Sequence, residues 1–255
     1  MPLEIVPGRL SVIIPAYNEE SAILTTLQET IAALNGLDFE VVVVDDGSAD
    51  KTHYRVQEAA AADGRIKAVR YELNRGKGHA LRYGFGFTCG EKVAFLDADL
   101  DLHPRHLLKF SALMDSSGAD IVIGSKRHPD SVLEYPWHRR IISGVYFFLV
   151  KLMFGLPIHD TQTGVKLFKH EVLAQILPRL LVKRFAQDLE LLVAAHELGY
   201  SIVEAPVVLE FSRGYSGRIG LNAIWATWWD TMAVFYRAVI LRYYNHAPVE
   251  SRKEN

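Results

Sequence analysis

The chain has 255 residues, of which 49% are hydrophobic, and a formal net charge of −2. This length suits one large domain, or one domain with an extension, built around a sizeable core. A charge so close to neutral excludes the global basic field of a nucleic-acid-binding protein, so no nucleic acid partner is expected. The single cysteine, Cys89, excludes an intrachain disulfide and cysteine-rich zinc modules.

Apolar runs alternate with helical patterns through the first half of the chain. The runs that predict strands are residues 10–15, 40–44, 66–71, 92–96 and 120–124. The segments that predict helices are residues 19–34, 50–62, 78–87 and 106–114. Ser48 or Asp50 is available to cap the second of these helices. This alternation predicts an α/β fold, Rossmann-like, with a mostly parallel sheet and helices on both faces.

Polar residues gather at the expected carboxyl ends of four of these strands. They occupy residues 15–20, 45–48, 97–101 and 124–127. In open α/β sheets ligands bind beyond the carboxyl ends of the strands, and binding residues concentrate on loops held by a rigid scaffold. The sequence therefore predicts a binding site along this edge.

Asp97, Asp99 and Asp101 alternate at the end of the apolar run 93–96. In an extended chain alternate side chains share a face, and three carboxylates on one face repel one another unless a cation lies among them. Oxygen ligands favour Mg²⁺ or Mn²⁺, and Mg²⁺ keeps open positions for substrate phosphates. We predict a metal–diphosphate site here. The alternative is a solvated acidic turn before Pro104.

The other polar segments each have two interpretations. Asp45 or Asp46 can accept hydrogen bonds from a base or a ribose, or can simply form an Asp-Gly-Ser turn. Tyr17 can stack on a base or be a half-buried strand-end tyrosine. Residues 74–79 enter a helix, where Arg75 or Lys77 can add charge to a bound phosphate. This segment is not a P-loop, and no dinucleotide-binding glycine fingerprint follows the first strand.

A further helix is expected to start at Phe185 and to run to His196 or Glu197. Asp188 in its first turn is either a carboxylate that complements the helix dipole or a general base facing the cleft.

Six motifs together resemble the family 2 glycosyltransferases of the GT-A fold. They are VIIPAYNEE at 12–20, VVDDGSADKT at 43–52, NRGKGHALRYG at 74–84, FLDADLD at 95–101, DTQTGVKLF at 160–168 and RFAQDLELL at 184–192. More narrowly, they look like the dolichyl- or polyprenyl-phosphate hexosyltransferases, which include dolichyl-phosphate mannose synthase and dolichyl-phosphate glucosyltransferase. The resemblance covers about residues 9–218 and implies a GT-A domain over residues 1–218.

The resemblance also implies roles for individual residues. The nucleotide-sugar positions are Pro15, Tyr17, Glu19, Asp45, Asp46, Lys77, Asp97 and Ala98. The metal positions are Asp97, Asp99 and Asp101, the last where some members place a third ligand. The acceptor and phosphate positions are Arg127, Arg139, Arg140, Ser143, Gln162, Gly164, Arg213 and Arg218. The family usually has Ser-Lys in the late basic segment, whereas here Ser216 is followed by Gly217 and Arg218.

Such enzymes move a hexose, glucose or mannose, from a UDP- or GDP-sugar with inversion, and Asp99, Arg127 and Asp188 would be the catalytic residues. If the acceptor is a polyprenyl or dolichyl phosphate, it is already ionised near pH 7, because its second pKa is about 6. Asp188 would then orient groups. With a hydroxyl acceptor it would be an essential base.

Two apolar segments, residues 141–158 and 219–241, are interrupted by charged residues and are too short to span a membrane. Tryptophans with flanking arginines predict interfacial helices. Residues 219–247 would then form an amphipathic extension and residues 248–255 a loose tail, with the enzyme peripheral on the cytoplasmic membrane face. No signal peptide is expected. The alternative is a pair of core helices or helices at a homo-oligomer interface.

Three competing functions remain at this point. One is a soluble family 2 enzyme with a hydroxyl acceptor. Another is an inactive nucleotide-sugar-binding or scaffold protein, against which the Asp97/Asp99 pair argues. The third is a nucleotidyltransferase, whose products would be a sugar nucleotide and pyrophosphate.

Overall fold

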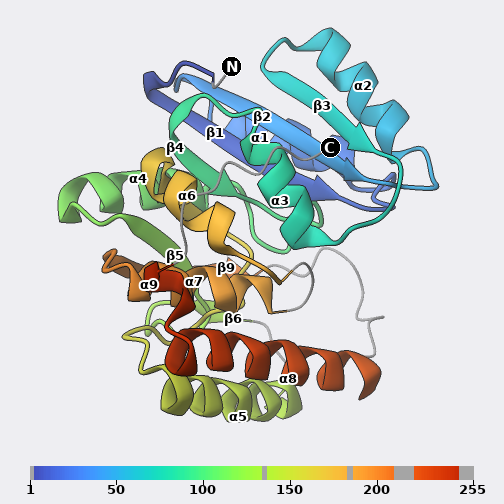
Figure 1. Cartoon of the computed structure of the whole chain (residues 1–255). Coiled ribbons are helices and arrows are strands. Elements are labelled where there is room, and N and C mark those ends of the chain that lie inside the picture. The colour runs from blue at the N-terminus through green and yellow to red at the C-terminus, as the bar shows by residue number, and fades with distance from the viewer. Residues whose placement is uncertain (1–2, 134–136, 183–185, 210–220, 247–255) are drawn as a thin grey trace.

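The computed structural model describes residues 3–133, 137–182, 186–209 and 221–246 (Figure 1). Its centre is a seven-stranded sheet in the order β3-β2-β1-β4-β7-β5-β8. The strands are β1 (Val6–Ala16), β2 (Phe39–Asp46), β3 (Ile66–Tyr71), β4 (Gly90–Phe95), β5 (Ile121–Ser125), β7 (Lys166–Lys169) and β8 (Ile202–Pro206). A second, two-stranded sheet consists of β6 (Val132–Leu133) and β9 (Val208–Leu209).

All five predicted strands are present, and β1 pairs in parallel with both β2 and β4. The sequence did not predict β7, which lies between β4 and β5 and is antiparallel to both. Its run is only four residues long and contains two lysines. Neighbouring strands are about 4.8 Å apart, so this insertion puts β5 about 10 Å from β4. The polar end of β5 is thereby moved away from the aspartates that follow β4.

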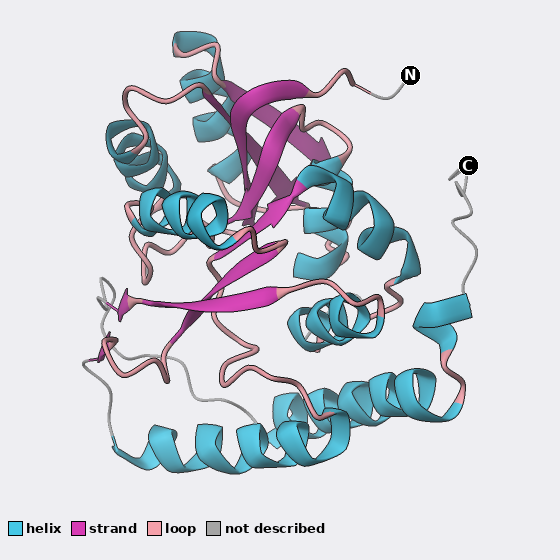
Figure 2. Cartoon of the chain, turned by 90° about the vertical axis from the view of Figure 1, so that its left-hand side faces the viewer, coloured by secondary structure: helices cyan, strands magenta, loops and turns pink. Residues whose placement is uncertain are grey.

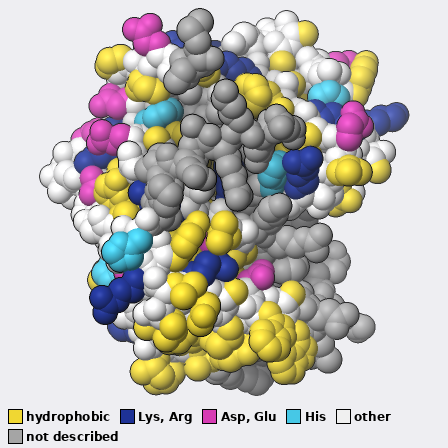
Figure 3. All heavy atoms as spheres, in the orientation of Figure 1, with side chains coloured by type: hydrophobic (Ala, Val, Ile, Leu, Met, Phe, Trp, Pro, Cys, Tyr) yellow, Lys and Arg dark blue, Asp and Glu magenta, His cyan; other side chains and the backbone are white. Residues whose placement is uncertain are grey.

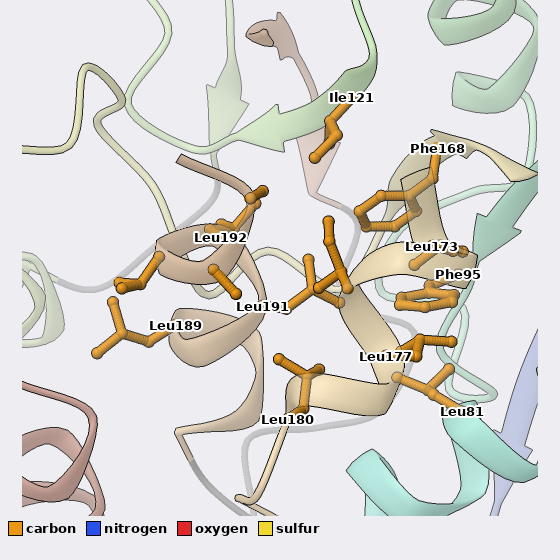
Figure 4. Packing of buried hydrophobic residues seen from close by; sticks show 14 of the residues in the cluster. Leu81, Phe95, Ile121, Phe168, Leu173, Leu177, Leu180, Leu189, Leu191 and Leu192 are labelled. Atoms are coloured by element: carbon orange, nitrogen blue, oxygen red, sulfur yellow. The ribbon is translucent and has the colours of Figure 1, made fainter. Parts of the chain in front are cut away.

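Helices cover both faces of the sheet, as predicted. They are α1 (Ile23–Ala33), α2 (Thr52–Ala62), α3 (Lys77–Phe85), α4 (His106–Ser117), α6 (His170–Ile176) and α7 (Gln187–Glu197). Alternate strand residues point to opposite faces. Val41 and Val43 of β2 accordingly pack in the cluster that contains α1, α2 and α4, whereas Val42 and Val44 pack with α3, α6 and α7. Figure 4 shows Leu189, Leu191 and Leu192 of α7 in this second cluster.

The loops after β1 and β2 are joined by polar contacts. Asp50 accepts a hydrogen bond from the Thr52 backbone N–H at 2.9 Å and thus supports the start of α2. Ser48, the other predicted cap, instead accepts the Asn18 backbone N–H at 3.0 Å. The loop after the first strand is thereby fixed to the loop after the second.

Two long helices, α5 (Trp137–Phe154) and α8 (Leu221–Phe235), lie side by side at one end of the molecule (Figures 1 and 2). The hydroxyl oxygens of Tyr146 and Thr231 are 3.1 Å apart and link them. A π-helical turn (Tyr236–Ile240) and α9 (Tyr243–His246) follow α8. Ala238 and Tyr244 from these two elements are buried in the same cluster as α7. Within the described residues, no helix has the length and apolar character needed to cross a bilayer.

Candidate active site

A pocket of about 300 Å³ lies where β1, β2 and β4 end. Its lining residues are Pro15, Ala16, Tyr17, Glu19, Asp46, Lys77, Asp97, Ala98 and Asp99. Parallel strands bring their carboxyl ends to one edge, which is why segments distant in the sequence meet here. All residues of the predicted nucleotide-sugar set except Asp45 line this pocket.

Asp46 holds the segment that leads into α3. One of its carboxylate oxygens accepts hydrogen bonds from the Tyr71 hydroxyl and the Arg75 N–H, each at 2.7 Å, and the other accepts the Gly76 N–H at 2.9 Å. Burial, together with the Asp46 carboxylate, raises the pKa of Tyr71, so the hydroxyl keeps the proton that it donates. Gly47, at a φ of +70°, lies so close to residues 72–74 that a Cβ would be 2.8 Å from the Asn74 nitrogen.

Asp45, which the resemblance placed in the nucleotide-sugar set, lies outside the pocket. It is the neighbour of Asp46 on a strand, so its side chain points to the other face. Its carboxylate accepts the Ser48 N–H at 2.9 Å and lies 3.4 Å from Nε of Arg70. The side chain is buried. The structure thus matches the turn interpretation of this residue.

Lys77 and Asp97 form an ion pair inside the pocket. Lys77 Nζ is 2.5 Å from Asp97 Oδ1, and about a third of each side chain is exposed. Burial lowers the pKa of Lys77, but the carboxylates of Asp97 and Asp188 outweigh it and raise that pKa. Burial raises the pKa of Asp97, but Lys77, Lys166 and Lys126 outweigh it and lower that pKa. Both groups are therefore charged near neutral pH.

Asp99 is in a markedly negative environment. Burial, followed by the carboxylates of Asp97 and Asp101, raises the pKa of Asp99 to about 6, although the Asp101 backbone N–H donates to it at 3.1 Å. Glu19 adds to this effect. A divalent cation would relieve such an excess of negative charge, and carboxylate oxygens are the ligands that Mg²⁺ and Mn²⁺ prefer.

The segment that carries the three aspartates is not extended, so the alternation that would place them on one face of an extended chain does not apply. β4 ends at Phe95, Ala98 and Asp99 lie in a turn, and Leu100 has a φ of +61°. Asp101 does not line the pocket. Within the described part of the chain, no group of three or more His, Cys, Asp or Glu side chains is arranged to hold a metal ion. Asp97 and Asp99 remain as a pair, which suffices for Mg²⁺ when substrate phosphates and water complete its shell.

Asp188, in the first turn of α7, is paired with Lys166 of β7. Lys166 Nζ is 2.6 Å from Asp188 Oδ1 and donates to the Thr163 carbonyl at 2.5 Å, while its side chain is buried. Lys166 was not among the predicted site residues. A lysine within the apolar run 165–168 is expected to be buried and therefore to need a partner of opposite charge. Its position in this run was the feature of the sequence that could have identified it.

The loop at residues 160–164 closes against the pocket through Gly164. A Cβ on this glycine would lie 1.8 Å from Asp97 Oδ2. The Asp160 carboxylate anchors the loop by accepting the Lys126 N–H at 2.9 Å and the Thr163 hydroxyl at 2.7 Å. Gln162 is exposed and donates its backbone N–H to Asp160. The predicted acceptor loop therefore touches the Asp97 carboxylate directly.

The remaining predicted phosphate-binding residues are only partly placed. Arg127 is exposed, with its guanidinium carbon 4.7 Å from the ring centre of Phe147 on α5, and it does not line the pocket. Arg139, Arg140 and Ser143 belong to α5, but their side chains lie outside the described part of the structure. Arg213 and Arg218 lie outside the described residues.

A family model described as glycosyl transferase family 2 matches residues 11–177, which is more than half of the chain. The chain belongs to glycosyl transferase family 2. It is a glycosyltransferase, and hexosyltransferases are among its relatives.

Glycosyltransferase AglD of Haloferax volcanii is 32% identical over 202 residues, which cover 78% of this chain and 32% of AglD. A dolichyl-phosphate beta-glucosyltransferase of Trichomonas vaginalis is 33% identical over 240 residues, 89% of this chain and 74% of that protein. This chain thus spans about a third of the length of AglD.

The solved structures show the same fold. Glucosyl-3-phosphoglycerate synthase of Mycobacterium tuberculosis, in complex with Mn²⁺, UDP and phosphoglyceric acid, superposes with a TM-score of 0.68 at 23% identity. The match covers 90% of this chain and 78% of that chain. The mixed, mostly parallel sheet with helices on both faces is the GT-A fold.

Proposed function

We propose that this family 2 glycosyltransferase transfers glucose or mannose from a UDP- or GDP-sugar to a polyprenyl or dolichyl phosphate, with inversion. The observation that carries the proposal is the pocket in which Asp97, Asp99 and Lys77 meet. Relatives named as dolichyl-phosphate beta-glucosyltransferases support the acceptor. The mycobacterial structure with Mn²⁺ and UDP supports the donor.

Asp97 and Asp99 would hold Mg²⁺ or Mn²⁺, because their oxygens suit these ions. Burial raises the pKa of Asp99, and the carboxylates of Asp97 and Asp101 raise it further, which is negative charge that a bound cation would offset. When bound, the ion would offset charge that develops on the leaving diphosphate. Lys77, already ionised beside Asp97, adds positive charge for the same group. Pro15, Tyr17 and Glu19 line the pocket at the end of β1, where the nucleoside would be held.

The ion pair between Asp188 and Lys166 favours a phosphate acceptor. One of its oxygens is already held by the buried ammonium of Lys166 at 2.6 Å. A carboxylate in such a pair is better suited to orient groups than to remove a proton. A phosphate monoester needs no base near neutral pH, because it is largely ionised. A hydroxyl acceptor, the second candidate, would require Asp188 to act as a base.

We expect Asp188→Asn to lower kcat/KM less than about tenfold with a phosphate acceptor, because no proton has to be removed. With a hydroxyl acceptor the loss should be roughly 10²–10⁴-fold, which is the contribution of general base catalysis. The measurement is steady-state transfer at a temperature where both proteins are folded, since the substitution leaves Lys166 without its counter-charge. A large loss with the lipid phosphate would contradict the orienting role.

An apolar surface on α5 and α8 supports a membrane contact. Phe148, Leu152, Trp225 and Trp229 are each more than 60% exposed, and Figure 3 shows hydrophobic side chains gathered at this end of the molecule. A polyprenyl phosphate resides in a bilayer, so this apolar surface would lie on the cytoplasmic membrane face. Trp228, by contrast, is only partly exposed.

Replacing both Trp225 and Trp229 by Ala should weaken binding to liposomes at least about tenfold, because the variant lacks the two indoles that would be buried in the membrane interface. Co-sedimentation with anionic liposomes measures this. Tyr54→Ala on α2 is the control, because Tyr54 is similarly exposed, at 59%, on a different helix. Unchanged binding of the double variant would contradict a membrane contact at this surface.

The test of the function is a radiolabelled transfer assay with Mg²⁺ or Mn²⁺. UDP-glucose and GDP-mannose are supplied in parallel, each with undecaprenyl or dolichyl phosphate in detergent. Label in the organic phase would establish lipid-phosphate transfer and identify the sugar. Release of nucleoside diphosphate without labelled lipid would favour a hydroxyl acceptor. Release of pyrophosphate would indicate a nucleotidyltransferase, and no turnover by the folded protein would support the scaffold alternative.

A further inference from the structure

Gln187, the first residue of α7, carries a buried amide that has no hydrogen-bond partner among the described residues. The residue is 1% exposed, and both Nε2 and Oε1 are unpaired. A glutamine amide offers two donor hydrogens and an acceptor oxygen, and buried groups of this kind are nearly always hydrogen-bonded. Such an amide is a group that a bound ligand can satisfy.

Gly78, in the first turn of α3, leaves the space that this side chain occupies. A Cβ on Gly78 would lie 2.6 Å from Gln187 Cγ and 3.2 Å from Cδ. The φ of Gly78 is not in the left-handed region, so the glycine is needed for space and not for backbone conformation. The absence of a side chain at Gly78 thus lets the amide lie against the start of α3.

The chain neighbours of these two residues belong to the proposed catalytic site. Lys77 precedes Gly78, lines the pocket and pairs with Asp97. Asp188 follows Gln187, pairs with Lys166 and raises the pKa of Lys77 by its charge. The Gln187 side chain does not itself line the pocket; it lies against Gly78 where α3 meets α7, next in the chain to residues of the proposed site.

The chemistry of the amide selects the kind of ligand group. It is uncharged and can both donate and accept, which matches a sugar hydroxyl. A diphosphate would instead be matched by cations such as Lys77, and a divalent metal by carboxylates such as Asp97 and Asp99. Under the proposed function, the hexose of the nucleotide-sugar donor carries several hydroxyls and would extend from the diphosphate beside Lys77 toward α7.

We propose that Gln187 is a specificity-determining residue whose amide hydrogen-bonds a hydroxyl of the donor hexose. The inference rests on the proposed function and names the part of the donor that this side chain recognises. A site built to hydrogen-bond a substrate hydroxyl discriminates strongly against sugars that place this hydroxyl differently, because the buried amide is then left unpaired.

Gln187→Leu tests this by thermal unfolding in the presence of ligands. The variant without ligand should melt about 2–4 °C above the wild type, because an unpaired buried amide has been removed. UDP or GDP should raise the melting temperature of both proteins equally. The additional rise given by UDP-glucose or GDP-mannose should occur in the wild type and be lost in the variant. Transfer kcat/KM should fall roughly 10- to 100-fold.

Gln175→Leu is the matched control, because it makes the same substitution at an exposed position on α6. It should change neither the melting temperature nor the response to the sugar. Gln187→Met serves as a second variant if the leucine variant does not fold. A sugar-dependent rise that survives in the folded variant would overturn the inference and leave the proposed function intact. No sugar-dependent rise in the wild type would also overturn the inference, whereas the proposed function would fail only if the transfer assay showed no hexose transfer.

Discussion

Asp99→Ala is expected to lower metal-dependent hexose transfer about 10³-fold or more, while the protein stays folded. The substitution removes one of the two carboxylates that line the pocket and would hold the metal. Transfer rates at saturating Mn²⁺, with circular dichroism to verify folding, measure this. Asp101→Ala is the comparison, because Asp101 follows in the same motif but does not line the pocket. Its loss should stay below about tenfold, and retained activity in Asp99→Ala would exclude that residue from the metal site.

Whereas the loss of the Asp99 carboxylate should lower activity, the raised pKa of Asp99 predicts that this loss should raise the stability of the metal-free protein near neutral pH. The folded protein has a pKa of about 6 at this carboxyl, above the ordinary value of about 4. Protonated Asp99 therefore stabilises the metal-free fold below pH 4, and this contribution is lost as the pH rises through 6. We expect metal-free Asp99→Asn to be more stable than the wild type at pH 7 by about 1–2 kcal/mol, allowing for solvent screening.

At pH 4 the two metal-free proteins should be equally stable, because Asp99 is then protonated in the wild type as well. Saturating Mn²⁺ at pH 7 should stabilise only the wild type and so reverse the order. Melting temperatures from pH 4 to 8, with metal or with a chelator, measure both effects. A metal-free wild type that is the more stable protein at pH 7 would contradict the environment described for Asp99.

Arg237→Met is expected to destabilise the fold by about 3–5 kcal/mol, since it leaves a buried carboxylate without its counter-charge. Glu190 of α7 is fully buried, and Arg237 Nη2 is 2.8 Å from it. The Tyr244 hydroxyl and the backbone N–H groups of Leu181 and Val182 also donate to this carboxylate. Urea unfolding measures the loss.

The matched control is Arg65→Met, which breaks an Arg–Asp pair of similar length, 2.6 Å, with the arginine side chain 42% exposed. Arg65→Met should lower the free energy of unfolding by less than about 1 kcal/mol, because exposed ion pairs contribute little to stability. Adding Glu190→Gln to Arg237→Met should recover much of the loss, because the buried charge is then gone. A loss equal to that of the surface control would mean that the C-terminal helices do not depend on this contact with α7.

Short-range patterns were sufficient to predict five of the seven strands of the main sheet and most of the residues that line the pocket. The run of buried valines predicted β2 because a strand's pattern is local. Polar residues at strand ends indicated the pocket, since parallel strands align their carboxyl ends. Residues 12–20 and 95–101 carried the family resemblance as contiguous motifs. Pro15, Tyr17, Glu19, Lys77, Asp97 and Asp99 consequently lie together as expected.

The sequence could not predict features that depend on which distant segments are neighbours. The two adjacent aspartates of β2 are chemically alike, and only the side of the sheet that each faces directs Asp46 to the pocket and Asp45 to Arg70. The alternation of Asp97, Asp99 and Asp101 was misleading, because the turn at Ala98 and the left-handed Leu100 end the extended chain.

By itself, then, the sequence determined the class of fold, the family and the set of polar groups along one edge, because these follow from local periodicity and contiguous motifs. Tertiary structure alone decided that β7 separates β4 from β5 and brings Lys166 to Asp188. It also decided that Glu190 meets Arg237 and that Gln187 lies against Gly78. The physical reason is that packing joins segments that are far apart in the chain. Packing therefore decides whether a buried charge has a partner within hydrogen-bond distance, as Glu190 does, or a buried amide has none among the described residues, as at Gln187.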